Sequence, residues 1–440
     1  MGKLKYKGNI SKTVDIEYFP FEIKNKEKMT LESLEEKFPD VEDWKIIREL
    51  NLLNTNPEIL YRPFNTLSGG EQVKVLLSSL FAKENEFLLI DEPTNHLDLE
   101  AKKSIEKYLQ KKKGYILVSH DRKLLDNTCD HILAINNSGI EIIKGNYSTW
   151  KENKDRRDVF ELKENEKLKS EISKLDIASK RTANWSDKVE KSKYGDSHVD
   201  KGYIGHKAEK MMKRSKAILL RQEKKIKEKE GLLKNIDRID SLVIKPLEYM
   251  KNNLVLVDNL GIKYGNKTIC ENVSFEINRK DRIALTGKNG SGKSSILKLL
   301  LGDNIEYFGD LKIGNNIKIS YVPQTTEILN GLTMRDYAKK LDIDESIFKA
   351  MLSKLGVDSK EFNKRIDELS EGQKKKVLIS ASISNNADLY IWDEPLNYID
   401  IESRLQIEEA ILKYEPTIIF VEHDETFVQN IATKIIKIGK

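Results

Sequence analysis

The sequence predicts an α/β protein in which two related domains flank a long helical arm. Motifs in residues 1–149 return in residues 246–440 at a nearly constant offset, and in both segments apolar strand-like runs alternate with helix-like runs. Residues 150–245, between these two segments, are rich in Lys, Glu and Leu, which suits long helices. At 440 residues, the chain is long enough for several domains that each bury a core.

The composition predicts a soluble protein of the cytoplasm. Charged residues make up 33% of the chain, the mean hydropathy is −0.54, and no apolar run approaches the ~18 residues that span a bilayer. Cys129 and Cys270 lie far apart without metal-ligand spacing, and no signal segment opens the chain. We therefore expect a reducing compartment.

The repeat rests on pairs of matching residues in the two halves. The pairs and their offsets are Ser68 and Ser370 (302), Asp91 and Asp393 (302), His120 and His423 (303), Tyr18 and Tyr321 (303), and Gly2 and Gly302 (300). A chance resemblance would not hold its offset over so many positions.

A glycine-rich loop occurs in the second half alone. Residues 286–301 read TGKNGSGKSSILKLLL, follow the strand-like run RIALT and match the pattern GxxxxGK[ST]. In such a loop, backbone N–H groups and a helix N-terminus converge on a phosphate. The candidate phosphate-binding residues are Gly287, Asn289, Gly290, Gly292, Lys293, Ser294 and Ser295. The first-half counterpart of Lys293 would fall before Met1, so we expect the first domain to lack this loop, and whether Met1 is the true start stays open.

Polar side chains follow strand-like runs elsewhere in the second half. Asp393 and Glu394 end the run ADLYIWDE, His423 ends TIIFVEH, and Gln324 follows ISYVP. Parallel strands bring such side chains to one edge of a sheet. We assign Asp393 and Ser294 to Mg²⁺, Gln324 to the metal or the attacking water, Glu394 to the attacking water, and His423 to the γ-phosphate.

Two aromatic residues have competing interpretations. Tyr264 precedes the glycine-rich loop and can stack on adenine, or it is an ordinary half-buried strand tyrosine. Trp392 is expected to be a core residue of its strand, and a ligand contact is the alternative.

The words LSGGEQ and LSEGQ predict helix N-termini that receive a phosphate from another domain. In the first half the candidates are Ser68, Gly69 and Gly70. In the second half Glu371 replaces a glycine between Ser370 and Gly372, and a carboxylate there weakens the attraction for phosphate. The two halves are therefore chemically unequal.

The arm is predicted to be two antiparallel helices with a tip near residues 188–206. The helices are DVFELKENEKLKSEISKL and AILLRQEKKIKEKEGLLKNI, and the turn lies in SDKVEKSKYGDSHVDKGYIGH. Apolar residues at three- and four-residue steps give the first helix a packing face. These residues are Leu162, Leu168, Ile172 and Leu175.

Positive charge gathers in the second half of the arm. Residues 201–225 carry nine Lys or Arg against two Glu, a net +7 in a chain whose total is +5. A solvated helix face, a rigid spacer and an RNA contact are the alternatives. The candidate RNA-binding residues are Lys207, Lys210, Lys213, Arg214 and Lys216, and the candidate tip residues are Tyr194, His198, Tyr203 and His206.

The order of these motifs resembles the ATP-binding cassette superfamily. It runs through a phosphate loop (Walker A), a Q-loop glutamine, the LSGGE signature, a DEP sequence after an apolar strand (Walker B) and an H-switch histidine. Two cassettes in one chain, a charged arm between them and no membrane span resemble the ABC-F family of ribosome-associated ATPases. Within that family, the words IWDEPLNYID, KGYIGHKAEKMMKRSK and RPFNTLSGGEQVKVLL resemble the Lsa-type antibiotic-resistance branch.

This resemblance implies a monomer whose cassettes close head to tail over ATP and Mg²⁺. One site would join the phosphate loop of the second cassette to the signature of the first. The other would be degenerate, because it has no phosphate loop and Phe21 stands where the repeat predicts glutamine. Its remaining members would be Asp91, Glu92, His120, Ser370 and Gly372.

The implied partner is the ribosome, with 23S rRNA and P-site tRNA near the tRNA exit site. The arm would reach toward the peptidyl-transferase centre and release lincosamide, pleuromutilin or streptogramin A drugs. A housekeeping translation factor, a ribosome-binding protein with little ATP turnover and a transporter ATPase subunit are the alternatives.

The missing loop also predicts a weakened first cassette. We expect the phosphate-loop strand of a cassette to run between the Walker B strand and the strand before the H-switch. The first-half strands FLLID and GYILVSH would then lose a shared neighbour, and buried strands left as edges lose backbone partners. We therefore expect the second cassette and the arm to fold well and the first cassette poorly.

Overall fold

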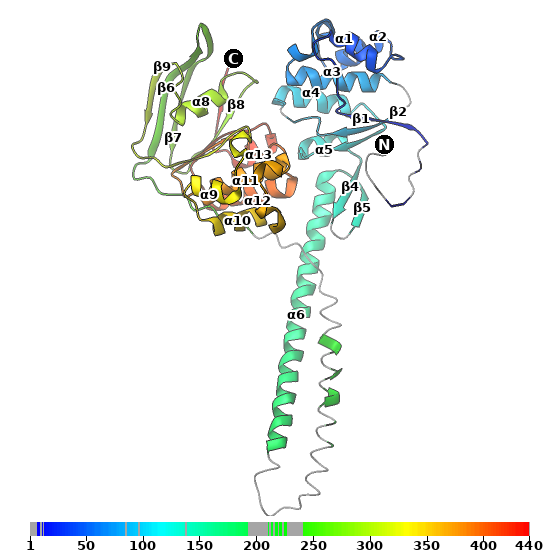
Figure 1. Ribbon diagram of the computed structural model, residues 1–440, viewed down its shortest axis with the longest axis vertical. Coiled ribbons are helices and arrows are strands. Elements are labelled where there is room, and N and C mark those ends of the chain that lie inside the picture. The colour runs from blue at the N-terminus through cyan, green and yellow to red at the C-terminus, as the bar shows by residue number, and fades with distance from the viewer. Residues whose placement is uncertain are drawn as a thin grey trace, which may run out of the picture. The chain divides into compact units, whose positions relative to one another are not determined.

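The computed structural model describes residues 7–8, 11, 13–83, 86–95, 97–136, 139–191 and 241–439, with some positions between 210 and 226. The chain divides into two compact units, one of Met1–Tyr147 with Ile239–Lys440 and one of Ser148–Arg238 (Figure 1). The first unit contains both repeats and the second contains the arm. Within the described residues, no helix combines the length and the apolar character needed to cross a membrane.

The second repeat contains a parallel sheet and an antiparallel sheet. The parallel sheet has the order β10-β11-β12-β8-β13 and the antiparallel sheet the order β7-β6-β9. The strands are β6 (Asn253–Tyr264), β7 (Lys267–Asn278), β8 (Arg282–Thr286), β9 (Tyr307–Ile313), β10 (Ile319–Val322), β11 (Leu389–Asp393), β12 (Ile418–Val421) and β13 (Lys434–Lys437). The helices are α8 (Lys293–Leu300), α9 (Met334–Lys340), α10 (Glu345–Lys354), α11 (Glu371–Ser384), α12 (Ile401–Tyr414) and α13 (Glu425–Ile431).

Continuous apolar runs explain the centre of the parallel sheet. Every residue of β11 and β12 is buried, as expected for parallel strands covered on both faces. Trp392 is 1% exposed and its indole Nε1 donates to Ser382 Oγ at 2.9 Å, so it is a core residue. The predicted strands RIALT, ISYVP, ADLYIWDE and TIIFVEH are confirmed as β8, β10, β11 and β12.

The first repeat has a smaller parallel sheet in the order β1-β2-β3, and β4 and β5 form an antiparallel hairpin. The strands are β1 (Asp15–Phe19), β2 (Glu86–Asp91), β3 (Tyr115–Val118), β4 (His131–Asn136) and β5 (Gly139–Lys144). The helices are α1 (Thr30–Lys37), α2 (Asp43–Leu52), α3 (Gly69–Ala82), α4 (Leu99–Leu109) and α5 (Arg122–Thr128). A continuous apolar core forms here, with Leu34, Leu50 and Leu77 fully buried.

The predicted place of the phosphate-loop strand is wrong. In the second repeat β8 lies between β12 and β13, and β11 pairs directly with β12. The strands FLLID and GYILVSH likewise pair directly, in the register Leu88–Tyr115 to Asp91–Val118. They have therefore lost no shared neighbour.

The edge exposed in the first repeat is instead the outer side of β3. This strand has no second neighbour among the described residues, and Ile116 and Val118 are 47% and 50% exposed. By the repeat offset β4 corresponds to β13, but it pairs with β5 in the described part of the chain. Apolar side chains of the hairpin are exposed too, among them Ile135 and Ile140.

The arm begins with one long helix, α6 (Tyr147–Lys191), which includes the predicted helix of residues 158–175. Its candidate packing residues are half-buried between exposed polar neighbours. The turn predicted from Ser186 begins too early, because the Lys- and Glu-rich sequence continues the helix to Lys191. Lys210, Lys213 and Lys216 are helical and exposed. The other arm candidates, Lys207, Arg214, Tyr194, His198, Tyr203 and His206, lie outside the described residues.

Candidate nucleotide site

The glycine-rich loop joins the end of β8 to the start of α8. Gly292 is the N-cap of α8 with a φ of 96°, which favours glycine. At Gly287 a Cβ atom would lie 2.3 Å from the carbonyl oxygen of Ile438, so a side chain does not fit. Lys293 Nζ donates to the carbonyl oxygens of Gly287 and Lys288, both at 2.9 Å. The loop thus holds the buried Lys293 by two of its own backbone carbonyl groups.

The carboxyl edge of the sheet brings four predicted side chains together. Gln324 Nε2 donates to Glu394 Oε1 at 2.9 Å, and His423 Nε2 lies 3.7 Å from the same oxygen. Asn397, which sequence reasoning missed, donates to Glu394 Oε2 at 2.8 Å. Asp393 lies directly before Glu394 and accepts a hydrogen bond from Ser294 at the start of α8. The parallel register of β10, β11 and β12 produces this convergence.

The two neighbouring carboxylates have opposite pKa shifts. Burial raises the pKa of Asp393 to about 6, against the opposing effect of the Ser294 hydrogen bond. Burial alone would raise the pKa of Glu394 as well, but His423, Gln324 and Asn397 outweigh it and lower this pKa to about 2. Both carboxyl groups are therefore mostly ionised at neutral pH, and Glu394 stays ionised to a much lower pH than Asp393.

Two buried polar atoms at this edge lack hydrogen-bond partners among the described residues. They are Asp393 Oδ1 and His423 Nε2, whose 3.7 Å separation from Glu394 is an ion-pair distance. Buried polar groups are normally paired, so each has the capacity to bind something further. A carboxylate oxygen beside the Ser294 hydroxyl suits Mg²⁺, and a ring nitrogen suits a phosphate oxygen. The residues thus fit a magnesium nucleotide.

A cavity of about 360 Å³ lies over the loop. Tyr264 is 50% exposed at the end of β6, and its hydroxyl donates to Ser295 Oγ at 3.2 Å. The lining residues are Tyr264, Ile269, Asn289, Gly290, Gly292, Lys293, Ser294, Ser295, Gln324 and Glu394. Most of the predicted nucleotide ligands of the second repeat therefore face one space.

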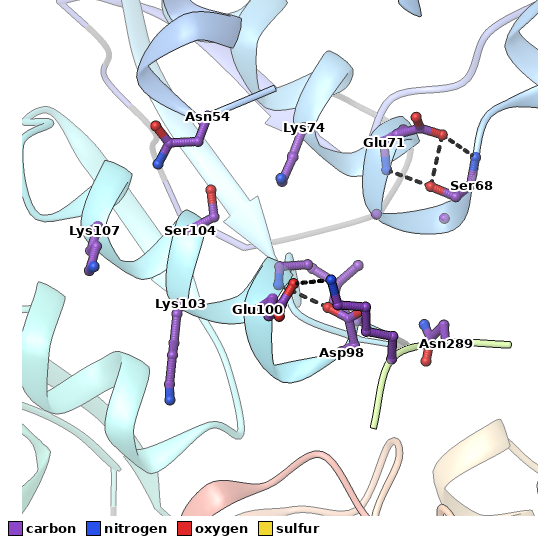
Figure 2. A pocket seen from close by; sticks show the side chains of 15 residues that line it. Asn54, Ser68, Glu71, Lys74, Asp98, Glu100, Lys103, Ser104, Lys107 and Asn289 are labelled. Atoms are coloured by element: carbon purple, nitrogen blue, oxygen red, sulfur yellow. Dashed lines mark hydrogen bonds and ion pairs between the residues drawn. The ribbon is translucent and has the colours of Figure 1, made fainter. Parts of the chain in front are cut away.

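A second cavity, of about 680 Å³, joins the two repeats (Figure 2). Ser68, Gly69 and Gly70 line it from the first repeat, and Lys288 and Asn289 line it from the glycine-rich loop. Ser68 caps α3 through a capping box with Glu71, as the signature sequence predicts. An ion pair of 3.1 Å between Lys288 and Glu100 crosses between the repeats.

Further polar residues of this cavity were not found from the sequence. Lys74 lies one turn beyond the signature, and Lys103 and Lys107 lie on one face of α4 (Figure 2). Burial lowers the pKa of Lys74, with Asp98 and Glu71 acting in the opposite direction. The four-residue spacing of Lys103 and Lys107 after Asp98 was a signal for a basic face.

The equivalent edge of the first repeat is arranged differently. Tyr18 donates its hydroxyl proton to Asp91 Oδ2 at 2.7 Å, and His120 Nε2 lies 3.7 Å from Glu92 Oε1. Burial raises the pKa of Glu92 to about 7. Phe21, the counterpart of Gln324, packs edge-on against the ring of Phe38 at 5.0 Å. This edge therefore has an apolar side chain, packed against the core, where the second repeat has Gln324.

Ser370 and Glu371 of the second signature form hydrogen bonds within their own repeat. Ser370 caps α11 in a capping box with Gln373. Glu371 accepts from Lys374 Nζ and from Thr326 Oγ1, both at 2.8 Å, and these contacts outweigh burial to lower its pKa. The predicted carboxylate does stand at this helix N-terminus.

Side chains of the second repeat other than its signature affect His120, at the carboxyl edge of the first sheet. Burial lowers the pKa of His120, and Arg404, Asp400 and Lys376 are nearby charges that modify it. Gly372 packs against the Tyr398 backbone of its own repeat, where a Cβ atom would lie 2.6 Å from the carbonyl oxygen.

Comparison with known proteins supports this arrangement of motifs. The family model described as ABC transporter matches residues 6–95 and 270–397. The ABC transporter ATP-binding protein YkpA of Bacillus subtilis is 28% identical over 419 residues, which cover 92% of this chain and 72% of YkpA. The ribosome protection protein VmlR of Bacillus subtilis is 29% identical over 381 residues, covering 84% of this chain and 68% of VmlR. The energy-dependent translational throttle protein EttA of Haemophilus influenzae is 28% identical, covering 85% of this chain and 64% of EttA.

Solved structures agree on the fold. The archaeal ribosome recycling factor aABCE1, solved in complex with the ribosomal stalk protein aP1, has a TM-score of 0.60 at 22% identity. That comparison covers 97% of this chain and 72% of the other. RNase-L inhibitor has a TM-score of 0.57 at 23% identity, covering 94% of this chain and 69% of the other. The repeats, their motifs and these similarities lead to one conclusion: the chain is built from two ATP-binding cassettes of the ABC type.

Proposed function

We propose that this chain is a ribosome-associated ATPase of the ABC-F family that hydrolyses ATP at one composite site. The observation that carries the enzymatic part is the cavity shared by Ser68, Gly69 and Gly70 of the first cassette and Asn289 of the second. A helix N-terminus on one wall and a phosphate loop on the other suit a nucleotide held between them.

In this proposal the second cassette supplies the reacting groups. The loop amides and Lys293 bind the phosphates, and Tyr264 stacks on the adenine. Ser294, Asp393 and Gln324 hold Mg²⁺, which when bound neutralises charge on the phosphate oxygens. His423 contacts the γ-phosphate.

Glu394 orients the attacking water by accepting a hydrogen bond from it. Its carboxylate is ionised at neutral pH, and Gln324 and Asn397 fix its two oxygens at 2.9 and 2.8 Å. A carboxylate with a low pKa is a weak general base, so positioning of the water is the larger contribution.

The site of the first cassette is proposed to be inactive in this chain. The Tyr18 hydroxyl donates a hydrogen bond to Asp91, and Phe21 stands at the position that corresponds to Gln324. Asp91, Glu92, His120, Ser370 and Gly372 are then the remaining members of a degenerate site.

The ribosomal part of the proposal rests on relatives and on charge. VmlR is named a ribosome protection protein and EttA a translational throttle protein. Lys210, Lys213 and Lys216 are exposed on the arm, and together with Lys207 and Arg214 they are proposed to contact RNA phosphates. We propose binding at the tRNA exit site and release of lincosamide, pleuromutilin or streptogramin A drugs, and a housekeeping translation role is the alternative.

Replacing Glu394 with Gln tests the proposal. Phosphate release and co-sedimentation with 70S ribosomes are measured for the unchanged chain, for Glu394→Gln and for the matched variant Glu92→Gln. We expect Glu394→Gln to stop phosphate release and to tighten ribosome association, whereas Glu92→Gln keeps its turnover. If Glu394→Gln changes neither quantity, the chain is a ribosome-binding protein without coupled turnover or has another function. Drug susceptibility of cells with and without the gene decides between resistance and housekeeping.

A further inference from the structure

We propose that Lys102 of the first cassette is a positioning residue for His423 of the second. Lys102 Nζ donates a hydrogen bond of 3.0 Å to the carbonyl oxygen of His423. The inference rests on the proposed function, because His423 matters to turnover only if the second cassette hydrolyses ATP. It gives the first cassette a second part in turnover, besides its signature.

The loop that carries His423 is fixed on its other sides by its own cassette. Glu422 accepts from the His423 N–H at 2.7 Å and from the Leu396 N–H at 2.8 Å. Asp424 caps α13 by accepting from the Phe427 N–H at 3.0 Å. The carbonyl oxygen of His423, in contrast, accepts its hydrogen bond from the other cassette.

Further contacts between the cassettes surround this point. Glu425 forms ion pairs with Lys123 at 2.8 Å and with Lys103 at 3.6 Å. Behind them Arg122 pairs with Glu408, and their side chains are only 10% and 7% exposed. Because these contacts come from α4 and α5 together, Lys102 is held against the loop and does not reach it as a freely moving surface lysine.

The repeat offers an equivalent residue with which the contact of Lys102 can be compared. By the offset of 302, Lys102 corresponds to Arg404. Arg404 uses its donors within its own cassette, on the carbonyls of Ile399 and Leu396 and on the carboxylate of Asp424. Lys102 lies 3.8 Å from Asp121, the counterpart of Asp424, and directs a hydrogen bond outward. The two equivalent positions therefore differ in where their donors point, into the cassette at Arg404 and across to His423 at Lys102.

The expected consequence is a change in the rate of the chemical step. The His423 ring is 7% exposed and lies 3.7 Å from Glu394, so a small rotation of its backbone moves Nε2 away from the reacting phosphate. Loss of one hydrogen bond from a charged donor is expected to lower kcat about tenfold. KM for ATP should stay the same, because Lys102 lines neither cavity.

Two measurements on the full chain test the proposal, with Lys102→Met, Lys102→Arg and the exposed control Lys111→Met. The first is steady-state ATP turnover, resolved into kcat and KM. The second is hydrogen–deuterium exchange of the segment 423–428 without nucleotide, which does not depend on turnover. We expect Lys102→Met to lower kcat about tenfold at constant KM and to speed exchange in this segment, Lys102→Arg to restore both, and Lys111→Met to match the unchanged chain.

The outcomes separate this inference from the proposed function. If the unchanged chain hydrolyses no ATP, the proposed function fails, and with it the positioning role, whatever exchange shows about the contact. If turnover is present but Lys102→Met matches Lys111→Met in kcat, the positioning role is overturned, with or without faster exchange. A rise in KM together with the loss of kcat, without rescue by Lys102→Arg, would show a merely structural role and overturn it as well.

Discussion

The substitution of Glu by Gln should have opposite effects on stability at the two equivalent positions, Glu92 and Glu394. Both carboxylates follow the last residue of a central strand, with φ values of 48° and 47°. Burial raises the pKa of Glu92 from 4.5 to about 7, whereas hydrogen bonds that outweigh burial lower the pKa of Glu394 from 4.5 to about 2. The comparison is made without nucleotide or magnesium.

The sign follows from proton linkage. The stability that protonated Glu92 gives is complete below pH 4.5 and is lost as the pH rises through about 7, since the buried group must then ionise. The pKa difference corresponds to up to about 3 kcal/mol at pH 8, which Glu92→Gln would recover. The stability from ionised Glu394 is present above pH 4.5 and is lost as the pH falls through about 2. Glu394→Gln should therefore cost up to about 3 kcal/mol at neutral pH.

Urea titrations at pH 5 and pH 8 provide the assay. Peptides from residues 86–109 and 389–414, followed by hydrogen exchange, report the two cassettes separately. We expect Glu92→Gln to stabilise the first cassette at pH 8 and to have little effect at pH 5. Destabilisation by Glu92→Gln at pH 8, or an equal effect at both pH values, would show that burial does not raise the pKa of Glu92.

Other features lead to three further predictions. Arg122→Met should destabilise the contact between the cassettes by about 3 kcal/mol, because the buried Glu408 loses its ion-pair partner, and the double variant with Glu408→Gln should recover most of this in a denaturation cycle. Ile116→Lys, on the open edge of β3, should reduce self-association in sedimentation velocity, and unchanged association would show that this edge does not mediate it. Gly287→Ala should weaken ATP binding at least about tenfold in a fluorescence titration, since a Cβ atom collides with a backbone carbonyl, and normal binding would contradict the proposed phosphate site.

The sequence predicted local elements better than their neighbours in space. Apolar runs identified β8 and β11, because burial on both faces leaves a continuous hydrophobic signal. The order of strands depends on long-range pairing, which no local pattern contains, and this is why β8 was expected beside β11. The end of α6 was missed because helix-forming Lys and Glu residues extend past Ser186 toward the glycines.

At the site, the sequence predicted the residues within motifs, but not the residues outside the motifs that form hydrogen bonds with them or line the cavity. The spacing of the motifs led to Gln324 and Glu394, but not to Asn397, which reaches Glu394 because the backbone turns sharply at that residue. Lys74 lines the cavity between the cassettes, and Lys102 donates a hydrogen bond to the other cassette. Sequence periodicity describes which face of a helix they occupy, and only the packing of the two cassettes shows what that face meets.

Turnover of matched signature variants tests the composite site most directly. Ser68 and Ser370 cap equivalent helices through equivalent capping boxes, so Ser68→Arg and Ser370→Arg disturb the two helix ends alike. We expect Ser68→Arg to lower ATP turnover at least about tenfold and Ser370→Arg to leave most of it, because the first signature shares a cavity with the glycine-rich loop and Ser370 does not line that cavity. Equal losses in the two variants, or a greater loss in Ser370→Arg, would contradict this expectation.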